Sequence, residues 1–216
     1  MARYLAIRVF RGEGYVQLCQ PQYVKKVLSR FKMENCSTAP TPTGSVAISH
    51  ADCPSSEEEK RKVRNFPFKE LVGSLLYKMI CISPEIAYAV VKLTQFSENF
   101  GTKHISWGKR IVRYLAGNID SGIKYVRGDG KIIIYVYSDS GDRNRRKSVS
   151  GYVVFLAQGP VAWRSVKQRI VAQSTCEAEF IALSEAIKEL LWFLKMLKEL
   201  RFEMERKPRI FADNRQ

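Results

Sequence analysis

Three acidic residues in the C-terminal half of the chain have the chemistry and the placement to hold a metal ion. Asp139 ends the apolar run IIIYVYSD, and Asp213 ends the short run IFAD. Glu179 lies early in a long amphipathic segment, close to its apolar stripe, where a carboxylate without a partner would be costly. Glu179 alone could be a partly exposed helix acid, because acids are common on helices. Together the three residues predict a metal site.

The charge balance indicates a polyanionic partner. The 216 residues include 36 Lys and Arg against 21 Asp and Glu, which give a formal net charge of +15. Such a charge attracts a polyanion and the counterions that it releases, so nucleic acid is the leading partner. A basic protein without such a ligand, or one that binds a membrane surface, is the alternative, because composition alone does not identify a ligand.

The remaining composition argues against several classes of protein. No apolar run approaches the roughly 20 residues that span a bilayer, and the apolar segment at the N-terminus is too short for a signal peptide. We therefore expect a protein of the cytoplasm or nucleus with no membrane partner. The five cysteines are scattered without a CxxC pair, which argues against a disulfide framework and against a zinc site.

The first 120 residues predict a hairpin followed by helices. RYLAIRVF and YVQLCQ flank RGEG, a pattern typical of a β-hairpin. A helix should begin at Pro21, and a long surface loop with one exposed helical turn should cover residues 33–64. Three amphipathic helices should follow, beginning near Phe68, at Ser83-Pro84-Glu85 and near Lys103.

The third of these helices, over about 103–116, combines basic and aromatic residues. Its basic residues should lie on the exposed face and follow a phosphate backbone, while Trp107 or Tyr114 stacks on a sugar or base. The alternative is a solvated helix face with its aromatic residues in the core. The candidate nucleic-acid-binding residues on this helix are Lys103, His104, Lys109, Arg110 and Arg113.

The C-terminal half predicts a sheet and one long helix. Strands are predicted over 122–126 and 131–139, the second apolar enough for the middle of a sheet, and GYVVFLA and PVAWRS form two more after a basic turn. Ser174 and Glu177 have capping-box spacing, so Glu177 is a cap partner at the start of the helix rather than a metal ligand. The predicted buried face of the helix comprises Phe180, Leu183, Ala186, Ile187, Leu190, Leu194 and Leu197.

Long ordered motifs in both halves resemble a known family. LCQPQYVKKVLSRFKMENC, FKELVGSLLYKMICISPEIAYAV and HISWGKRIVRYLAG resemble the end of the reverse transcriptase of copia-type LTR retrotransposons, with its thumb and connecting region. RRKSVSGYVVFLAQGPVAWRSVKQRIVAQSTCEAEFIALSEAIKELLWF resembles the ribonuclease H domain that follows in the same Pol polyprotein. The resemblance covers nearly the whole chain. The paired aspartates of the polymerase would precede Met1, so polymerisation by this chain is not expected.

The resemblance implies a cofactor and a role for each acid. Ribonuclease H enzymes hold two Mg²⁺, or Mn²⁺ in their place, between an Asp ending the first strand, a Glu in the first long helix, an Asp ending the fourth strand and a further Asp downstream. Asp139, Glu179 and Asp213 match the first three positions. The implied reaction is hydrolysis of the RNA strand of an RNA–DNA hybrid. The implied candidates for contacts to the nucleic-acid backbone are Lys147, Arg164, Lys167 and Arg169.

The sequence also departs from the family pattern. The run SDSGDRNR is shorter than the family's usual run after the first ligand, and the sequence ends at Gln216, before the position of the fourth acid. We expect an α+β fold, with a hairpin and a helical thumb/connection-like part over 1–120 and a truncated ribonuclease H-like mixed sheet with a long helix over 121–216. The expected function is that of a ribonuclease H fragment of a retrotransposon Pol polyprotein, acting with the rest of the polyprotein in a virus-like particle. The alternative is an inactive remnant that binds nucleic acid.

Overall fold

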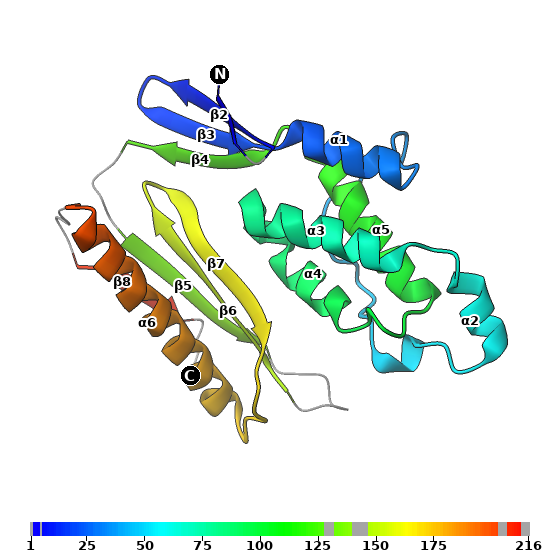
Figure 1. Cartoon of the computed structure of the whole chain (residues 1–216). Coiled ribbons are helices and arrows are strands. Elements are labelled where there is room, and N and C mark those ends of the chain that lie inside the picture. Colours follow the sequence, from blue (N-terminus) through cyan, green and yellow to red (C-terminus); the bar gives the residue numbers. More distant parts are fainter. Residues whose placement is uncertain (1, 5, 128–131, 140–146, 203–206, 213–216) are drawn as a thin grey trace. The chain divides into compact units, whose positions relative to one another are not determined.

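The computed structural model describes the backbone of residues 2–4, 6–127, 132–139, 147–202 and 207–212, and the side chains of all of these except 2–4 and 132–139. The chain forms two compact units. The first comprises Met1–Phe10 and Gln17–Ile123, and the second comprises Arg11–Val16 and Lys124–Gln216. Strands and helices are grouped along the chain rather than alternating, so the fold is α+β, as predicted (Figure 1). No helix in the described ranges is long and apolar enough to cross a membrane.

The first sheet has the strand order β1-β2-β3-β4. Its strands are β1 Ala2–Tyr4, β2 Ile7–Gly12, β3 Tyr15–Cys19 and β4 Gly122–Val126. A two-residue turn joins β2 to β3, and Gly14 in this turn has a φ of 72°, which glycine adopts without strain. The predicted first strand is divided in two, because the chain turns at Ala6 and β1 pairs antiparallel with β2.

The helices of the first unit, apart from α2 Glu57–Val63, pack around one apolar core. They are α1 Pro21–Arg30, α3 Phe68–Ile82, α4 Ala87–Thr94 and α5 Thr102–Gly117, with 3₁₀ turns at His50–Asp52 and Pro84–Ile86. Leu71, Val90 and Ile111, one from each of α3, α4 and α5, are completely buried. Apolar residues at helical spacing therefore drive the packing of the three predicted helices.

The predicted surface loop over 33–64 is partly buried. Met33, Ala39 and Ile48 are buried, and Met33 and Ile48 belong to the same core as the helices. The helical turn in this segment is α2, and the Oγ atom of its cap residue Ser56 accepts a hydrogen bond from the Glu59 N–H at 3.2 Å. The loop therefore follows a defined path across the first unit.

The second sheet has the strand order β7-β6-β5-β8. Its strands are β5 Ile132–Asp139, β6 Val149–Leu156, β7 Gly159–Lys167 and β8 Arg209–Ala212. β5, β6 and β7 are antiparallel neighbours, whereas β8 is parallel to β5 and follows the long helix α6 Thr175–Glu199. The helix serves as the crossover, because a short turn joins only antiparallel strands. β5 is an inner strand, as its apolar sequence predicted.

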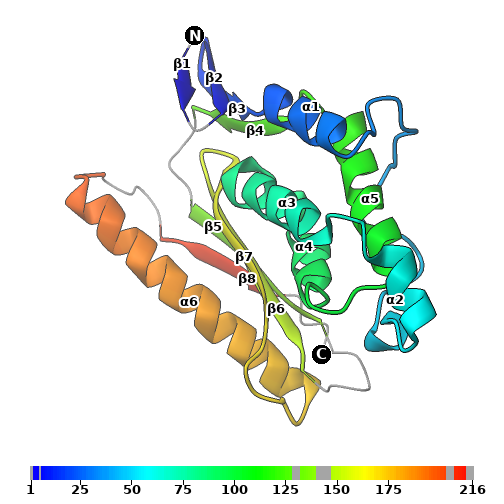
Figure 2. The same cartoon turned by 45° about the vertical axis from the view of Figure 1, so that its right-hand side comes forward.

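The long helix α6 packs against β5 and β6 of this sheet (Figure 2). The predicted buried face was wrong at Phe180 and Ile187, whose side chains are 65% and 37% exposed. Three alanines at four-residue spacing lie on the buried face and allow the helix backbone to approach the sheet closely. The residues buried on this face are Ala178, Ala182, Ala186, Leu190, Phe193 and Leu197.

Two glycines in helices of the first unit should respond oppositely to substitution by alanine. Gly73 in α3 has open space where a Cβ atom would lie, so Gly73→Ala should stabilise the protein by up to about 1 kcal/mol. At Gly108 in α5 a Cβ atom would lie 2.7 Å from Leu71 Cδ2 and 3.2 Å from Leu93 Cδ2, so Gly108→Ala should destabilise it by about 1–3 kcal/mol. Urea unfolding measures both changes. An unchanged stability of Gly108→Ala would contradict the close packing of α5 on its neighbours.

Candidate functional site

The backbone of β5 brings Asp139 to one end of the second sheet. Asp139 is the last residue of the strand and pairs with the first residue of β6, while its neighbour Ser138 pairs with Ser150. The side chain of Asp139 and the whole of Asp213 lie outside the described residues. The predicted roles of these two acids as metal ligands therefore stay predictions.

The start of α6 is organised by a cap that leaves Glu179 available. Ser174 Oγ accepts a hydrogen bond from the Glu177 N–H at 3.0 Å, and Glu177 Oε2 accepts one from the Gln173 N–H at 2.6 Å. Glu177 is thus the cap partner, as predicted, although its carboxylate bonds to Gln173 rather than to Ser174. Glu179 is half-buried and has no hydrogen bond or ion pair with any other described residue. Its carboxylate oxygens suit a hard cation such as Mg²⁺.

A buried amide joins the start of α6 to the sheet end that carries Asp139. The Nε2 atom of Gln168, the residue after β7, donates hydrogen bonds to Ser150 Oγ at 2.6 Å and to the Ala178 carbonyl at 2.8 Å. Ala178 directly precedes Glu179. The structure therefore brings together the backbone segments that carry two of the three predicted ligands. Within the described residues, no group of three or more His, Cys, Asp or Glu side chains could hold a metal ion.

The sequence reasoning did not single out Gln168. The available signal was a polar residue directly after an amphipathic strand and before a helix cap, in the run VKQRIVAQST. Such a residue is usually exposed, but Gln168 is only 4% exposed. Its burial could not be inferred from the local pattern, because its two partners lie 18 and 10 residues away.

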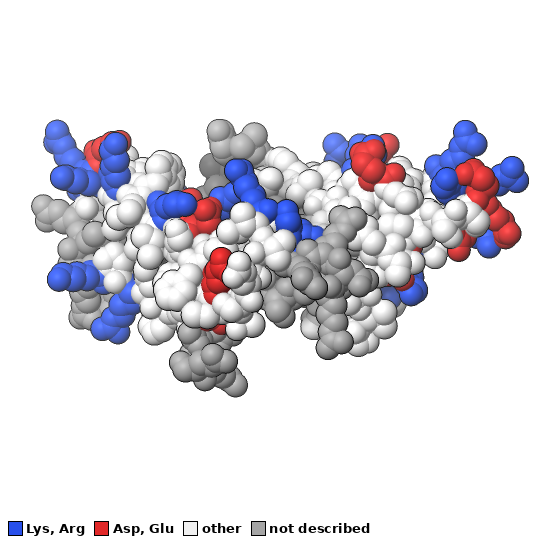
Figure 3. All heavy atoms as spheres, turned by 90° about the horizontal axis from the view of Figure 1, so that it is seen from below, with Lys and Arg blue, Asp and Glu red and all other residues white. Residues whose placement is uncertain are grey.

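Three of the four basic residues predicted in the second unit line one cavity. The cavity has a volume of about 430 Å³, and Arg164, Lys167 and Arg169 lie in its wall beside Gln168. Arg164 lies 3.6 Å from the Glu185 carboxylate in the same wall. The fourth, Lys147, adjoins this wall, since its Nζ atom donates to the Arg169 carbonyl at 2.6 Å. Lys and Arg side chains are also spread over the face of the molecule in Figure 3, with acids beside several of them.

Two arginines of α5 hold the loop of the first unit. Arg110 donates a hydrogen bond to Thr41 Oγ1 at 3.0 Å, and Arg113 Nε donates one to the Ser37 carbonyl at 2.6 Å. The Arg113 carbonyl in turn accepts from the Ala39 N–H at 3.2 Å. These half-buried side chains therefore have a structural role in tethering the loop, and their predicted contacts with nucleic acid stay a prediction.

The lysines of α5 are more exposed but also have partners in the first unit. Lys103 Nζ lies 2.6 Å from Asp52 Oδ1, and this hydrogen bond is the main reason that the pKa of Asp52 is lowered. Lys109 Nζ lies 5.3 Å from the centre of the Phe66 ring. Trp107 is buried and donates from its Nε1 atom to a carbonyl of α4, so it belongs to the core rather than to a stacking surface.

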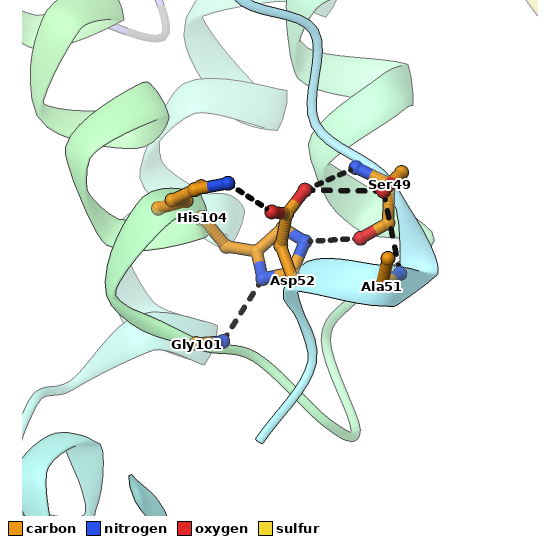
Figure 4. Close-up of polar contacts among 6 residues, drawn as sticks. Ser49, Ala51, Asp52, Gly101 and His104 are labelled. Carbon is orange, nitrogen blue, oxygen red and sulfur yellow. Dashed lines mark hydrogen bonds and ion pairs between the residues drawn. The ribbon is translucent and has the colours of Figure 1, made fainter. Parts of the chain in front are cut away.

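The expectation that His104 lies on the exposed face of α5 was wrong. The imidazole is completely buried, and its Nδ1 atom accepts a hydrogen bond from the Gly101 N–H at 2.9 Å (Figure 4). Nε2 lies 3.2 Å from the Ser49 carbonyl, which requires a proton on Nε2 and makes the ring neutral. The ring also stacks on Phe96, with 4.0 Å between the ring centres. His104 is buried although it is polar, because its ring pairs with a free backbone N–H at the helix start and with a backbone carbonyl of the loop.

Three relatives show similarity along the sequence, although no family model matches it. The retrovirus-related Pol polyprotein from transposon TNT 1-94 of Nicotiana tabacum is 39% identical over 85% of this chain and 14% of that protein. The Pol polyprotein from transposon RE1 of Arabidopsis thaliana is 31% identical over 98% of this chain and 14% of that protein. The secreted RxLR effector protein 161 of Plasmopara viticola is 40% identical over 60% of this chain and 93% of that protein.

Solved structures offer only a distant likeness. The foamy viral protease–reverse transcriptase dRH in complex with double-stranded DNA is 12% identical over 74% of this chain and 28% of that chain, with a TM-score of 0.37. Two of the sequence matches described above are to retrovirus-related Pol polyproteins from transposons. The chain belongs to the Pol polyproteins of copia-type retrotransposons. It spans about 14% of the length of the Pol polyproteins that it matches.

His104 should make the protein sensitive to mild acid. Burial lowers the pKa of His104 below its ordinary value of 6.5. The unfolded chain therefore binds a proton that the folded chain does not, so stability is complete above about pH 6.5 and is lost as the pH falls toward the lowered pKa. The free energy of unfolding should fall by up to about 1.4 kcal/mol per pH unit in this window. Urea unfolding at pH 7.5, 6.5 and 5.5 measures the slope.

A variant without the buried imidazole tests the assignment of this slope. His104→Gln should be less stable than the wild type by about 1–3 kcal/mol at pH 7.5, because a buried hydrogen bond is lost, and its slope should be smaller. His50→Gln, at the other histidine of the chain, is the control and should keep the slope. A slope that survives in His104→Gln would show that other groups cause it.

Proposed function

We propose that this part of a Pol polyprotein is a ribonuclease H that hydrolyses the RNA strand of an RNA–DNA hybrid. The observation that carries the proposal is the junction at Gln168, which ties the turn before Glu179 to the sheet end of Asp139. Shared cations would stabilise two carboxylates from distant parts of the sequence in neighbouring positions. Membership of the Pol family supports the same reaction.

The order of the elements in the second unit also supports the proposal. The family's ligands end the first strand, lie in the first long helix and end the fourth strand. In this unit β5 is the first strand of the second sheet, α6 is its long helix and β8 is its fourth strand along the chain. Asp139 ends β5, Glu179 lies in the first turns of α6 and Asp213 directly follows β8. Asp139 and Glu179 thus lie on elements of the expected kind, and Asp213 is the next residue in the sequence after the third such element.

The residues present fit divalent cations with oxygen ligands. Asp139, Glu179 and Asp213 would hold them, and their carboxylates match the preference of Mg²⁺ or Mn²⁺ for oxygen. When bound, such ions would supply activation of a water molecule and stabilisation of the leaving oxygen in phosphodiester hydrolysis. The half-buried position of Glu179 limits access of bulk water to its carboxylate. Glu179 would therefore bind a cation more strongly than a fully exposed acid would.

The basic wall of the cavity would position the nucleic acid. Arg164, Lys167 and Arg169 line it, and guanidinium groups bind phosphate oxygens with two parallel hydrogen bonds. These contacts orient a duplex without reading its sequence, and the 2′-hydroxyl distinguishes RNA from DNA. The proposed substrate is therefore a hybrid of any sequence.

Binding without cleavage is the second candidate function. It is favoured by the shortened run SDSGDRNR, which begins at the strand end of Asp139 and changes the chain beside the first proposed ligand. The basic cavity wall does not depend on this run. Such a protein would bind hybrids through its cations and leave them intact at any Mg²⁺ concentration.

Substitution of a proposed ligand should abolish cleavage of a hybrid. A labelled RNA–DNA hybrid is incubated with Mg²⁺ and the wild type, Asp139→Asn or Glu179→Gln, and RNA fragments are separated on a denaturing gel. We expect wild-type cleavage that EDTA stops, and a rate at least about 100-fold lower in either variant, because each loses a charge that holds the ions. Cleavage that persists in both variants would contradict the site.

A matched acid on the same helix controls for the loss of negative charge. Glu199 is exposed at the last turn of α6, far along the helix from Glu179, so Glu199→Gln should cleave at the wild-type rate. Hybrid binding by filter retention separates the two candidate functions. Binding without cleavage by the wild type would identify the second of them.

Basic residues of the cavity wall should set the salt dependence of hybrid binding. The affinity of the wild type should fall steeply with salt, and Arg169→Ala should reduce the slope of log K against log salt by about 1, because one phosphate contact is lost. Lys60→Ala is the control, since Lys60 lies in α2 of the first unit and pairs with Glu57 at 2.8 Å. Equal slopes for the wild type and Arg169→Ala would exclude Arg169 from the interface.

A further inference from the structure

We infer that Gln168 is a positioning residue, which holds the turn of α6 that carries Glu179 in register with the strand end that carries Asp139. The inference rests on the proposed function, because it assigns Gln168 a role in the geometry of that site. Gln168 lies in neither of the ligand-bearing elements, and its buried amide bonds to the protein rather than to a metal. Its effect would pass through the backbone of Ala178 and the side chain of Ser150.

The hydrogen bonds of Gln168 connect three elements at one point. Its backbone N–H donates to the Ser148 carbonyl at 2.8 Å, so the residue continues the pairing of β7 with the start of β6. Its side chain then forks, with Nε2 donating to Ser150 Oγ in β6 and to the Ala178 carbonyl in α6. Both Gln168 and Ser150 are more than nine-tenths buried. The fork therefore lies in an environment in which hydrogen bonds are strong and solvent does not replace them.

A short bonded path runs through this fork between the two proposed ligands. Asp139 adjoins Ser138, Ser138 pairs with Ser150 across the sheet, and Ser150 accepts from Gln168. Gln168 donates to the carbonyl of Ala178, the residue before Glu179. The α6 core on β5 and β6 fixes how closely the helix approaches the sheet, but apolar contacts are not directional. A hydrogen bond to one carbonyl sets the position of the helix along its axis.

The remaining atom of the amide argues against a purely stabilising role. Gln168 Oε1 is buried without a hydrogen-bond partner among the described residues. An unpaired buried acceptor destabilises the folded state, so an apolar side chain of similar length would serve stability about as well. Retention of an amide at this cost is explained if the position of its two N–H groups matters for function. The same reasoning predicts that Gln168→Met folds, because methionine fills a similar volume.

The test compares Gln168→Met with Tyr125→Phe by two measurements. The Tyr125 hydroxyl donates to the Pro160 carbonyl at 2.8 Å in the same unit, so Tyr125→Phe loses one hydrogen bond to a carbonyl at the opposite end of β7 from Gln168. The first measurement is amide hydrogen exchange over 175–182 without metal, which should become about tenfold faster in Gln168→Met. The second is the Mg²⁺ concentration that gives half of the thermal stabilisation, which should rise about 10- to 100-fold, as for residues that orient metal ligands. Both should stay at wild-type values in Tyr125→Phe.

Each outcome decides the inference. Unchanged exchange in Gln168→Met would overturn it, since the turn would then not depend on the amide. Faster exchange with an unchanged Mg²⁺ midpoint would also overturn it, because the residue would then be merely structural. A wild type that neither cleaves a hybrid nor responds to Mg²⁺ would refute the proposed function and the inference with it. If the wild type responds to Mg²⁺ but the Mg²⁺ midpoint of Gln168→Met is unchanged, the inference is refuted and the proposed function is not.

Discussion

Hydrogen bonds of buried polar side chains fix the relative positions of segments that apolar packing alone would leave free to slide or rotate. Apolar contact brings helices and sheets together, but it is compatible with small rotations and slides, whereas a buried donor or acceptor has to meet a partner at a defined distance. In the first unit, His104 bonds to the start of its own helix and to the loop carbonyl of Ser49. In the second unit, Gln168 bonds to the sheet and to the first turn of α6. Each unit thus has one buried side chain that sets how a helix start meets a neighbouring segment.

The same requirement explains how the first unit uses its cations. A long loop has many backbone carbonyls and few regular partners, and the exposed face of α5 carries donors that reach them. Arg113 bonds to the Ser37 carbonyl, Arg110 to Thr41 and Lys103 to Asp52, so the loop follows the helix along its length. A basic helix face therefore does not by itself indicate a nucleic-acid surface. In the second unit, Arg164, Lys167 and Arg169 line a cavity wall beside Gln168, although Arg164 also lies 3.6 Å from the Glu185 carboxylate.

The sequence predicted most of the elements, since apolar periodicity and caps are local signals. It identified the helix starts at Pro21 and Ser174, the inner strand that ends at Asp139 and the α+β class. It failed where the outcome depends on residues far away in the chain. Phe180 fits an amphipathic stripe, but the alanines of α6 determine the face that meets the sheet, and the stripe alone does not show how close the sheet must come. His104 has the polarity of a surface residue, and one of the two hydrogen-bond partners of its ring is the Ser49 carbonyl, 55 residues earlier in the chain. The same holds for the proposed site. Its acids could be predicted from the sequence motifs, whereas the link through Gln168 could not, because it depends on how three elements are arranged in space.

The net charge of the chain bears on how the proposed centre would bind its cations. A formal charge of +15 disfavours a further cation on the free chain, and this opposes the attraction of the carboxylates. A hybrid bound to Arg164, Lys167 and Arg169 would neutralise part of this charge beside the site and would add phosphate oxygens as ligands. Coupling between two binding sites is reciprocal, so the hybrid and Mg²⁺ would raise each other's affinity by the same factor. An excess of Lys and Arg would therefore make the proposed centre bind Mg²⁺ more tightly in the substrate complex than in the free chain. The complete metal centre would then form mainly when a phosphodiester is bound.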